Sequence, residues 1–113
     1  MMPGVRLRSV ELATLMMTFV EYAEGAVVPA HFHPNDQITY VIEGCIEVQV
    51  GGTQRLLGPG EGVRIPANTE HGSRPVDGPA KAVDAWTPVP AHFRVSPDET
   101  LGHHVPIEGE SIT

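Results

Sequence analysis

The chain has 113 residues, a mass of 12.1 kDa and a formal charge of −7, which suits one domain and not two. Its 14 acidic residues outnumber 7 scattered basic ones, so no basic stripe is available for phosphates and the composition argues against nucleic-acid binding. A hydrophobic content of 41% argues against disorder, and the lone Cys45 excludes an internal disulfide, so we expect a reduced, cytoplasmic location.

The first apolar stretch, residues 10–20, follows Arg6 and Arg8 as the core of a signal peptide would. Glu11 interrupts the stretch, and it is too short to span a bilayer. We therefore interpret it as a strand and expect no membrane partner.

Short runs rich in Val, Ile, Thr, Phe and Tyr follow one another along the chain, separated by turn residues. The expected strands are 15–21, 27–32, 37–42, 46–50, 53–57, 63–65 and 81–86. The expected turns include 43–44, a type I′ hairpin at 51–52, a type II turn at 59–60, and turns at 66–68 and 77–79. Strands this short and this closely spaced predict an all-β sandwich or barrel.

The faces of these strands differ. Residues 46–50 alternate between apolar and polar, as in a strand with one wet face, whereas 38–42 and 15–20 are apolar on both faces. The second pattern favours a homodimer, with one end of the same chain folded over the outer face as the alternative. From Ser96 the chain is polar and acidic, so we expect a barrel over residues 1–95 and a C-terminal extension over 96–113, packed on the barrel or partly disordered.

Histidine spacing suggests a metal site. His31 and His33 are two residues apart on an expected strand, so both rings should project from one face, and Gln37 follows after a short turn. With His71, three imidazoles and an amide oxygen would form a plausible shell for a divalent transition metal. The alternative is that His31 and His33 are exposed or hydrogen-bonded strand histidines.

The frame around these residues resembles the two cupin motifs. In chain order the frame reads Gly25, five residues, His31, one residue, His33, three residues, Gln37, six residues, Gly44, and later Gly60, five residues, Pro66, four residues, His71. The resemblance implies a single jelly-roll β-barrel (a double-stranded β-helix, RmlC-like) with an interior site. It also implies one ion of zinc, nickel, iron, cobalt or manganese, bound by His31, His33, Gln37 and His71.

Three motif positions depart from the usual cupin pattern. Gln37 stands where the first motif usually has Glu, so a bound ion keeps a fuller charge and is a stronger Lewis acid. In the second motif, Asn68 stands where Gly is usual and Pro75 where Asn is usual, and Asn68 tolerates a positive φ.

Among cupins, the segments around these ligands look most like the single-domain pectin-degradation group, which opens unsaturated uronate monosaccharides. That resemblance implies functional roles for Asp84 and Trp86. We favour an acid/base role for Asp84, with a structural hydrogen-bonding role as the alternative. For Trp86 we expect a substrate-binding role by stacking, with plain core packing as the alternative. Pro90 stands where the group has an Arg, which removes the usual partner of a substrate carboxylate. Arg64 and Arg74 are candidates to replace it, and His92 and Arg94 are further ones, with an exposed surface position without such a role as the alternative for each of the four.

We therefore expect a metal-dependent enzyme, isomerase-like or lyase-like, acting on a small sugar acid or keto acid by ring opening or tautomerisation. The alternatives are a non-catalytic small-molecule-binding cupin and a metal-dependent dioxygenase. Two adjacent tail histidines, His103 and His104, are expected to have no functional role.

Overall fold

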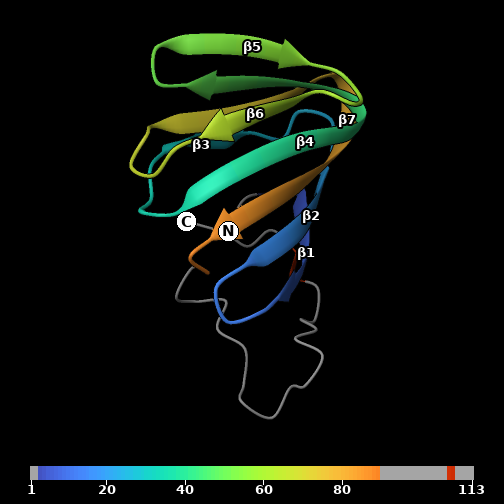
Figure 1. Cartoon of the computed structure of the whole chain (residues 1–113). Coiled ribbons are helices and arrows are strands. Elements are labelled where there is room, and N and C mark those ends of the chain that lie inside the picture. The colour runs from blue at the N-terminus through green and yellow to red at the C-terminus, as the bar shows by residue number, and fades with distance from the viewer. Residues whose placement is uncertain (1–2, 90–106, 109–113) are drawn as a thin grey trace.

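The computed structural model describes residues 3–89 and 107–108, and all its regular elements are strands (Figure 1). The strands are β1 (Val5–Glu11), β2 (Met16–Tyr22), β3 (Val28–His31), β4 (Asp36–Val50), β5 (Thr53–Leu57), β6 (Gly62–Ile65), β7 (His71–Thr87) and β8 (Ile107–Glu108). The described residues contain no helix long and apolar enough to cross a membrane. The predicted all-β class is confirmed.

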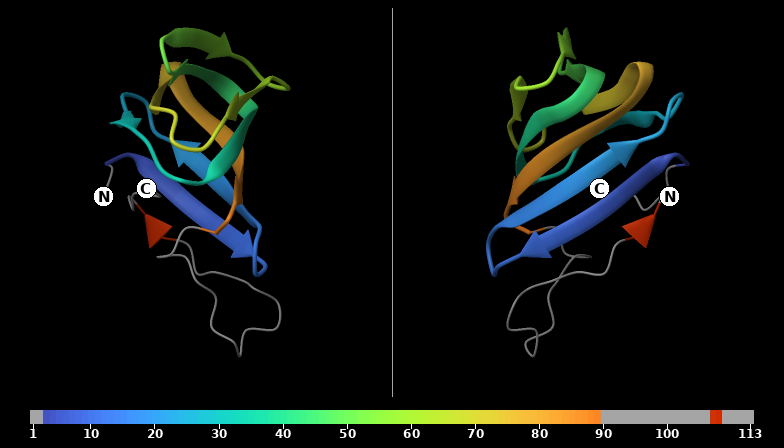
Figure 2. Two further views of the ribbon diagram at one scale, coloured as in Figure 1. Left: turned by 60° about the vertical axis from the view of Figure 1, so that its left-hand side comes forward. Right: turned by 90° about the vertical axis from the view of Figure 1, so that its right-hand side faces the viewer.

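Two long strands, β4 and β7, connect the two layers of the barrel. The first half of β4 pairs with β6 and with the end of β7, whereas its second half pairs with β5 and with the start of β7. Strand β2 pairs with the end of β7, and β3 pairs with the start of β7. Strand β1 pairs with the other edge of β2. Figure 2 shows β4 and β7 curving from one layer into the other. This arrangement is the predicted jelly roll.

The bends in these long strands lie where the sequence predicted turns. Residues 43–44 do not form a hairpin, because β4 continues through them with register shifts against β7. Gly44 has φ 77°, and a Cβ there would lie 2.5 Å from the Pro79 carbonyl oxygen. Opposite it, Asp77 and Gly78 also have positive φ inside β7. The two predicted turns were wrong because bulges use the same residues as turns.

The shorter connections agree better with the sequence. Residues 51–52 join β4 to β5 as predicted, but only Gly51 has a positive φ, so the hairpin is not type I′. Gly60 has φ 86° and the Glu61 N–H donates to the Gly58 carbonyl at 3.1 Å, as a type II turn requires. Asn68 has φ 62°, so it occupies the positive-φ position expected of it.

The N-terminal region holds a strand that the sequence reading missed. Residues 10–20 are not one strand: β1 ends at Glu11, β2 begins at Met16, and the Leu12 N–H donates to the Leu15 carbonyl at 2.8 Å between them. The strict alternation of burial in β1 places Val5 and Leu7 in the core. Of the expected extension 96–113, only Ile107–Glu108 lies within the described residues, paired with β1.

The apolar residues of the sheet β4–β7–β2–β1 divide between two faces. One face is buried in the core with Met16, Val41 and Trp86. The other face carries exposed side chains in neighbouring positions, and we call it the outer apolar face. Its residues are Val10, Met17, Ile38 and Tyr40, each about half exposed within the chain.

Candidate metal centre

Three strand ends bring the histidines together. His31 ends β3 and pairs with His71, the first residue of β7, while His33 lies just beyond β3 and Gln37 is the second residue of β4. The ring centroids of the three histidines are 4.4 to 5.6 Å apart. The expectation that His33 would share a strand with His31 was wrong, yet the structure brings all four predicted ligands to one place.

Each imidazole is oriented by a backbone carbonyl. The Nδ1 atoms of His31, His33 and His71 lie 2.7, 3.1 and 2.8 Å from the carbonyl oxygens of Pro29, Asn35 and Thr69. A carbonyl oxygen only accepts hydrogen bonds, so Nδ1 carries the proton and Nε2 keeps a free lone pair in each neutral ring. Such outer hydrogen bonds are the usual support of metal-binding histidines.

The donor atoms fit one small cation. The Nε2 atoms of His31 and His71 are buried without a hydrogen-bond partner, and ligand atoms of the three histidines lie within 4.8 Å of one another. The Nε2 of His33 lies 3.1 Å from Gln37 Oε1, so two acceptors face each other at the separation that two ligands of one ion adopt with bonds of about 2.1 Å. Three imidazoles and an amide oxygen suit a divalent transition metal.

Burial keeps two of these imidazoles neutral. Desolvation is the main cause that lowers the pKa of His31, and it lowers the pKa of His71 to about 4. The neighbouring histidines lower both values further, while the backbone hydrogen bonds to Pro29 and Thr69 act in the opposite direction. Neutral rings keep the lone pairs that a metal ion requires.

A hydrogen-bond chain connects Gln37, which faces His33, to Asp84. Gln37 Nε2 donates to Thr39 Oγ1 at 3.0 Å, and Thr39 Oγ1 donates to Asp84 Oδ1 at 2.7 Å. Asp84 is buried, and desolvation raises its pKa to about 6, although hydrogen bonds from Thr39 and Gln37 lower it. A carboxyl group with a pKa this close to neutrality can hold or release a proton near pH 7.

These side chains line a cavity of about 30 Å³ inside the barrel, room for an ion or a water molecule. Tyr22 and Ser73 also line this cavity, and the Tyr22 hydroxyl lies 3.1 Å from Ser73 Oγ. Burial is the main cause that raises the pKa of Tyr22 well above its ordinary value, so this hydroxyl stays protonated. The sequence reading missed Thr39 and Ser73, although strand alternation places them on the faces of Gln37 and His71.

The predicted substrate-binding residues lie in three different surroundings. Trp86 is buried in the core, with its ring centroid 4.9 Å from that of His33. Arg74 is exposed, and its Nε lies 3.0 Å from Glu47 Oε1, away from the cavity. Arg64 is exposed on β6. The further candidates His92 and Arg94, and the tail pair His103 and His104 that was expected to have no functional role, lie outside the described residues.

Comparison with known sequences gives the same picture. The chain matches the family described as Cupin domain over residues 18–86. It is 35% identical over 80 residues to the pectin degradation protein KdgF of Dickeya dadantii (strain 3937), covering 70% of this chain and 73% of that protein. It is also 35% identical over 63 residues to dimethylsulfoniopropionate lyase DddQ of Ruegeria pomeroyi, covering 55% of this chain but only 31% of that protein.

Solved structures agree with the sequence matches. KdgF from Halomonas sp. superposes with a TM-score of 0.76 at 32% identity, covering 81% of this chain and 86% of the other. An RmlC-like cupin from Shewanella frigidimarina NCIMB 400 gives 0.74 at 26% identity, covering 80% and 82%. The predicted resemblance to cupins of the pectin-degradation group is therefore confirmed.

Proposed function

Since this chain belongs to the cupin domain family, we propose that it is a metal-dependent enzyme that acts on a small sugar acid or keto acid. The single observation that carries the proposal is the buried Asp84, linked through Thr39 and Gln37 to the histidine site. A carboxylate in a barrel interior is costly, and its pKa of about 6 suits proton transfer near neutral pH.

The proposed roles follow from the contacts. His31, His33, Gln37 and His71 would hold one divalent ion, which supplies Lewis-acid polarisation of a hydroxyl or carbonyl oxygen when bound. Asp84 accepts a proton at its carboxylate and returns it at another substrate atom, as ring opening or tautomerisation requires. Thr39 holds Oδ1 of that carboxylate in place throughout.

The relatives favour a sugar acid as the substrate. Two matched proteins are KdgF proteins, one of them described as a pectin degradation protein. The test is to load the protein with zinc, nickel, iron, cobalt or manganese in parallel and to follow loss of the ultraviolet absorbance of an unsaturated galacturonate. Metal-dependent turnover that disappears in Asp84→Asn supports the proposal, whereas absence of turnover in every metal form contradicts it.

The same metal-loaded preparations distinguish the proposed enzyme from the two alternatives that the sequence left open, a dioxygenase and a non-catalytic binding module. Oxygen consumption would indicate a dioxygenase. Binding of a sugar acid, seen as thermal stabilisation without product, would indicate a non-catalytic module. Neither alternative gives Asp84 a chemical role, so the Asp84→Asn variant separates them from the proposed enzyme.

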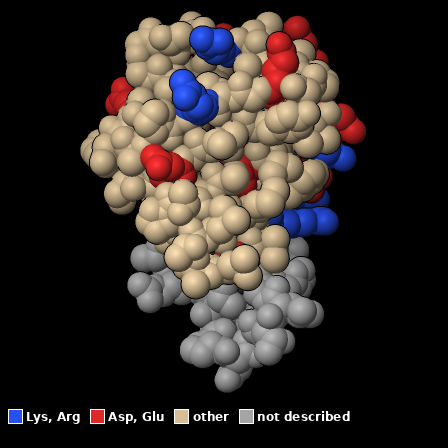
Figure 3. All heavy atoms as spheres, in the orientation of Figure 1, with Lys and Arg blue, Asp and Glu red and all other residues tan. Residues whose placement is uncertain are grey.

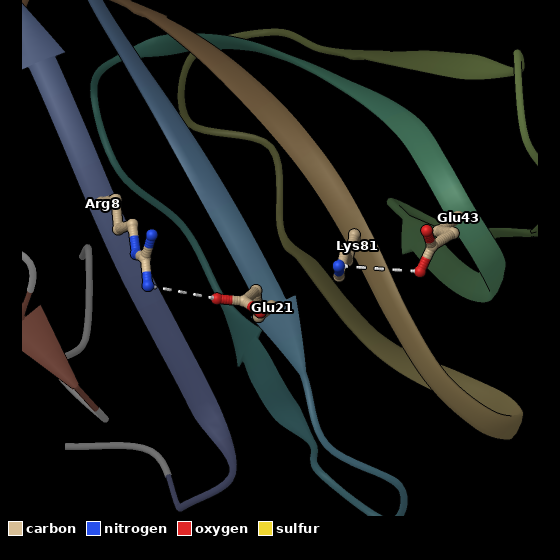
Figure 4. Close-up of polar contacts among 4 residues, drawn as sticks. All are labelled: Arg8, Glu21, Glu43 and Lys81. Atoms are coloured by element: carbon tan, nitrogen blue, oxygen red, sulfur yellow. Dashed lines mark ion pairs between the residues drawn. The ribbon is translucent and has the colours of Figure 1, made fainter.

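We also propose that the chain forms a homodimer through the outer apolar face. Arg8 lies in the row of Tyr40, 4.0 Å from Glu21 in the next row, where Lys81 lies 3.8 Å from Glu43. Figure 4 shows these two ion pairs, which lie at one side of the apolar residues. An apolar centre with charges of both signs beside it can complement a second copy of itself.

A further inference from the structure

Two loops supply or orient ligands of the candidate metal centre. The first loop, residues 32–35, joins β3 to β4 and contains His33. The second loop, residues 66–70, joins β6 to β7, and the carbonyl oxygen of its Thr69 orients the ring of His71. The loops belong to different motifs and lie far apart in the sequence, so contacts between them must fix how their ligands lie relative to one another.

Two hydrogen bonds tie these loops together. The Asn68 N–H donates to the His33 carbonyl oxygen at 2.7 Å. The Ala67 N–H donates to Asp36 Oδ1 at 2.9 Å. Asp36 is the first residue of β4 and directly precedes Gln37. The second loop therefore holds the first loop at both ends, beside one candidate ligand at each end.

The turn within the second loop leaves both of these N–H groups available. The Thr69 N–H donates to the Pro66 carbonyl oxygen at 3.2 Å, and Asn68 has φ 62°. Among the described residues that are not glycine, only Asn68 and Asp77 have a positive φ, so the turn has the form of type II, with Ala67 at its second position. Such a turn does not use the N–H groups of its two central residues.

Asp36 provides the side-chain part of this connection, since the other bond joins two backbone groups. A carboxylate that accepts from a backbone N–H forms a charge-assisted hydrogen bond. Figure 3 shows acidic side chains scattered over the visible face and not gathered in one patch, so a surface carboxylate is common in this chain. The bond to the loop of the other motif distinguishes Asp36 from these.

Glu70 provides a direct comparison. It is exposed and directly precedes the candidate ligand His71, as Asp36 is exposed and directly precedes Gln37. Unlike Asp36, its side chain makes no hydrogen bond or ion pair with any residue that the structure describes. The two carboxylates thus differ in the loop contact and not in their place beside a ligand.

We propose that Asp36 is a positioning residue of the metal centre, whose hydrogen bond to the Ala67 N–H fixes the two ligand loops at the separation that one ion requires. The inference rests on the proposed function and deepens its metal-binding part. Hydrogen bonds outside the ligands commonly change metal affinity by roughly 10- to 100-fold. Asp36 acts through the loops and touches no metal itself.

The test measures cobalt affinity of the EDTA-treated full chain by quenching of Trp86 fluorescence. Asp36→Ala removes the acceptor and should weaken cobalt binding about tenfold. Asp36→Asn removes the charge but keeps an oxygen that accepts, so its Kd should stay close to the wild-type value. Glu70→Ala is the matched control and should also bind cobalt like the wild type.

A second variant removes the donor of the same bond. Ala67→Pro deletes the N–H at a turn position where proline is favoured, so it should weaken cobalt binding about as much as Asp36→Ala. The double variant should lose no more than either single variant, because both changes break one bond. The visible absorption of bound cobalt should change in both variants, since displaced ligands alter its coordination, which a general loss of stability would not do.

Urea unfolding of the metal-free variants shows which of them are folded, and either single variant suffices if the other is not. Wild-type cobalt affinity in the folded variants overturns the inference, as does absence of cobalt binding by the wild type. An equal loss in Asp36→Asn or Glu70→Ala also overturns it, because charge would then be the cause.

The inference and the proposed function can fail separately. If the affinity losses occur while no metal form of the wild type turns over the unsaturated galacturonate, the proposed function fails and the inference stands. If the wild type turns over that substrate and Asp36→Ala keeps wild-type cobalt affinity, the inference fails and the proposed function stands.

Discussion

Replacing Asp84 by Asn should make the metal-free protein more stable at neutral pH while removing the proposed proton carrier. Asp84 is 3% exposed and accepts a hydrogen bond from Thr39, which an Asn oxygen can also accept. The variant therefore keeps the packing and the contact but removes the buried charge. A higher free energy of unfolding for the variant would show that the ionised Asp84 destabilises the folded wild type, as is common for residues kept for function.

The size of the effect follows from the pKa of Asp84. Burial raises this pKa from 3.8 to about 6, so the folded chain holds the proton more tightly than the unfolded chain does. At about 1.4 kcal/mol per pKa unit, the ionised form costs about 3 kcal/mol of folding free energy. The contribution of Asp84 to stability is therefore highest below about pH 4 and is lost as the pH rises from about 4 to 6. The advantage of Asp84→Asn should grow over the same window.

The assay is urea denaturation of EDTA-treated protein, followed by the fluorescence of the single tryptophan, from about pH 4 to about pH 8. The free energy of unfolding of the wild type is subtracted from that of the variant at each pH. This difference cancels the contribution of histidine titration, which is the same in both proteins. Glu24→Gln, in an exposed turn, controls for the loss of one negative charge. A difference that does not vary with pH, or a variant less stable than the wild type at about pH 8, would refute the reasoning.

Three other perturbations test the site, the outer face and the bulge. Cobalt bound beside His33 should quench Trp86 fluorescence and, at about 100 times its Kd, raise the free energy of unfolding by roughly 2.7 kcal/mol. Both effects should vanish in His71→Ala, and their persistence in that variant would contradict the candidate metal site. Ile38→Lys should convert a dimer to a monomer in light scattering, and a wild type that is already monomeric would exclude the proposed interface. Gly44→Ala should cost roughly 2 to 5 kcal/mol in urea unfolding, against little change for Gly52→Ala, whose Cβ would meet nothing within 4 Å.

The sequence predicted the site better than the strands that carry it. Motif spacing named the histidines and Gln37, and these residues meet even though His33 lies beyond β3 and not on it. The hydrogen bond that orients His33 is made with the Asn35 backbone carbonyl. The spacing of side chains in the sequence cannot predict a backbone contact of this kind. Strand ends were less predictable, since Gly44 serves a bulge with the same positive φ that a turn would use.

The arginines show why motif proximity is a weak guide to a binding role. Arg64 and Arg74 both flank the second motif, but β7 points Arg74 to Glu47 across the β4–β7 pair. Arg64 lies on β6, where Ile38 of the outer apolar face is its register partner. The face that a side chain takes depends on strand register, which closeness to a motif does not fix.

Gln37 has a geometric reason to replace the glutamate that is usual at its position. Its Oε1 faces His33 Nε2, while its Nε2 donates to Thr39, which in turn donates to Asp84. A glutamate could accept on the metal side but could not donate to Thr39. Thr39 has one proton, so it would then have to choose between two carboxylates, and the ionised form of Asp84 could lose its donor. The amide oxygen of Gln37 therefore faces the candidate metal centre, while its amide nitrogen supports the hydrogen bond from Thr39 to the buried Asp84.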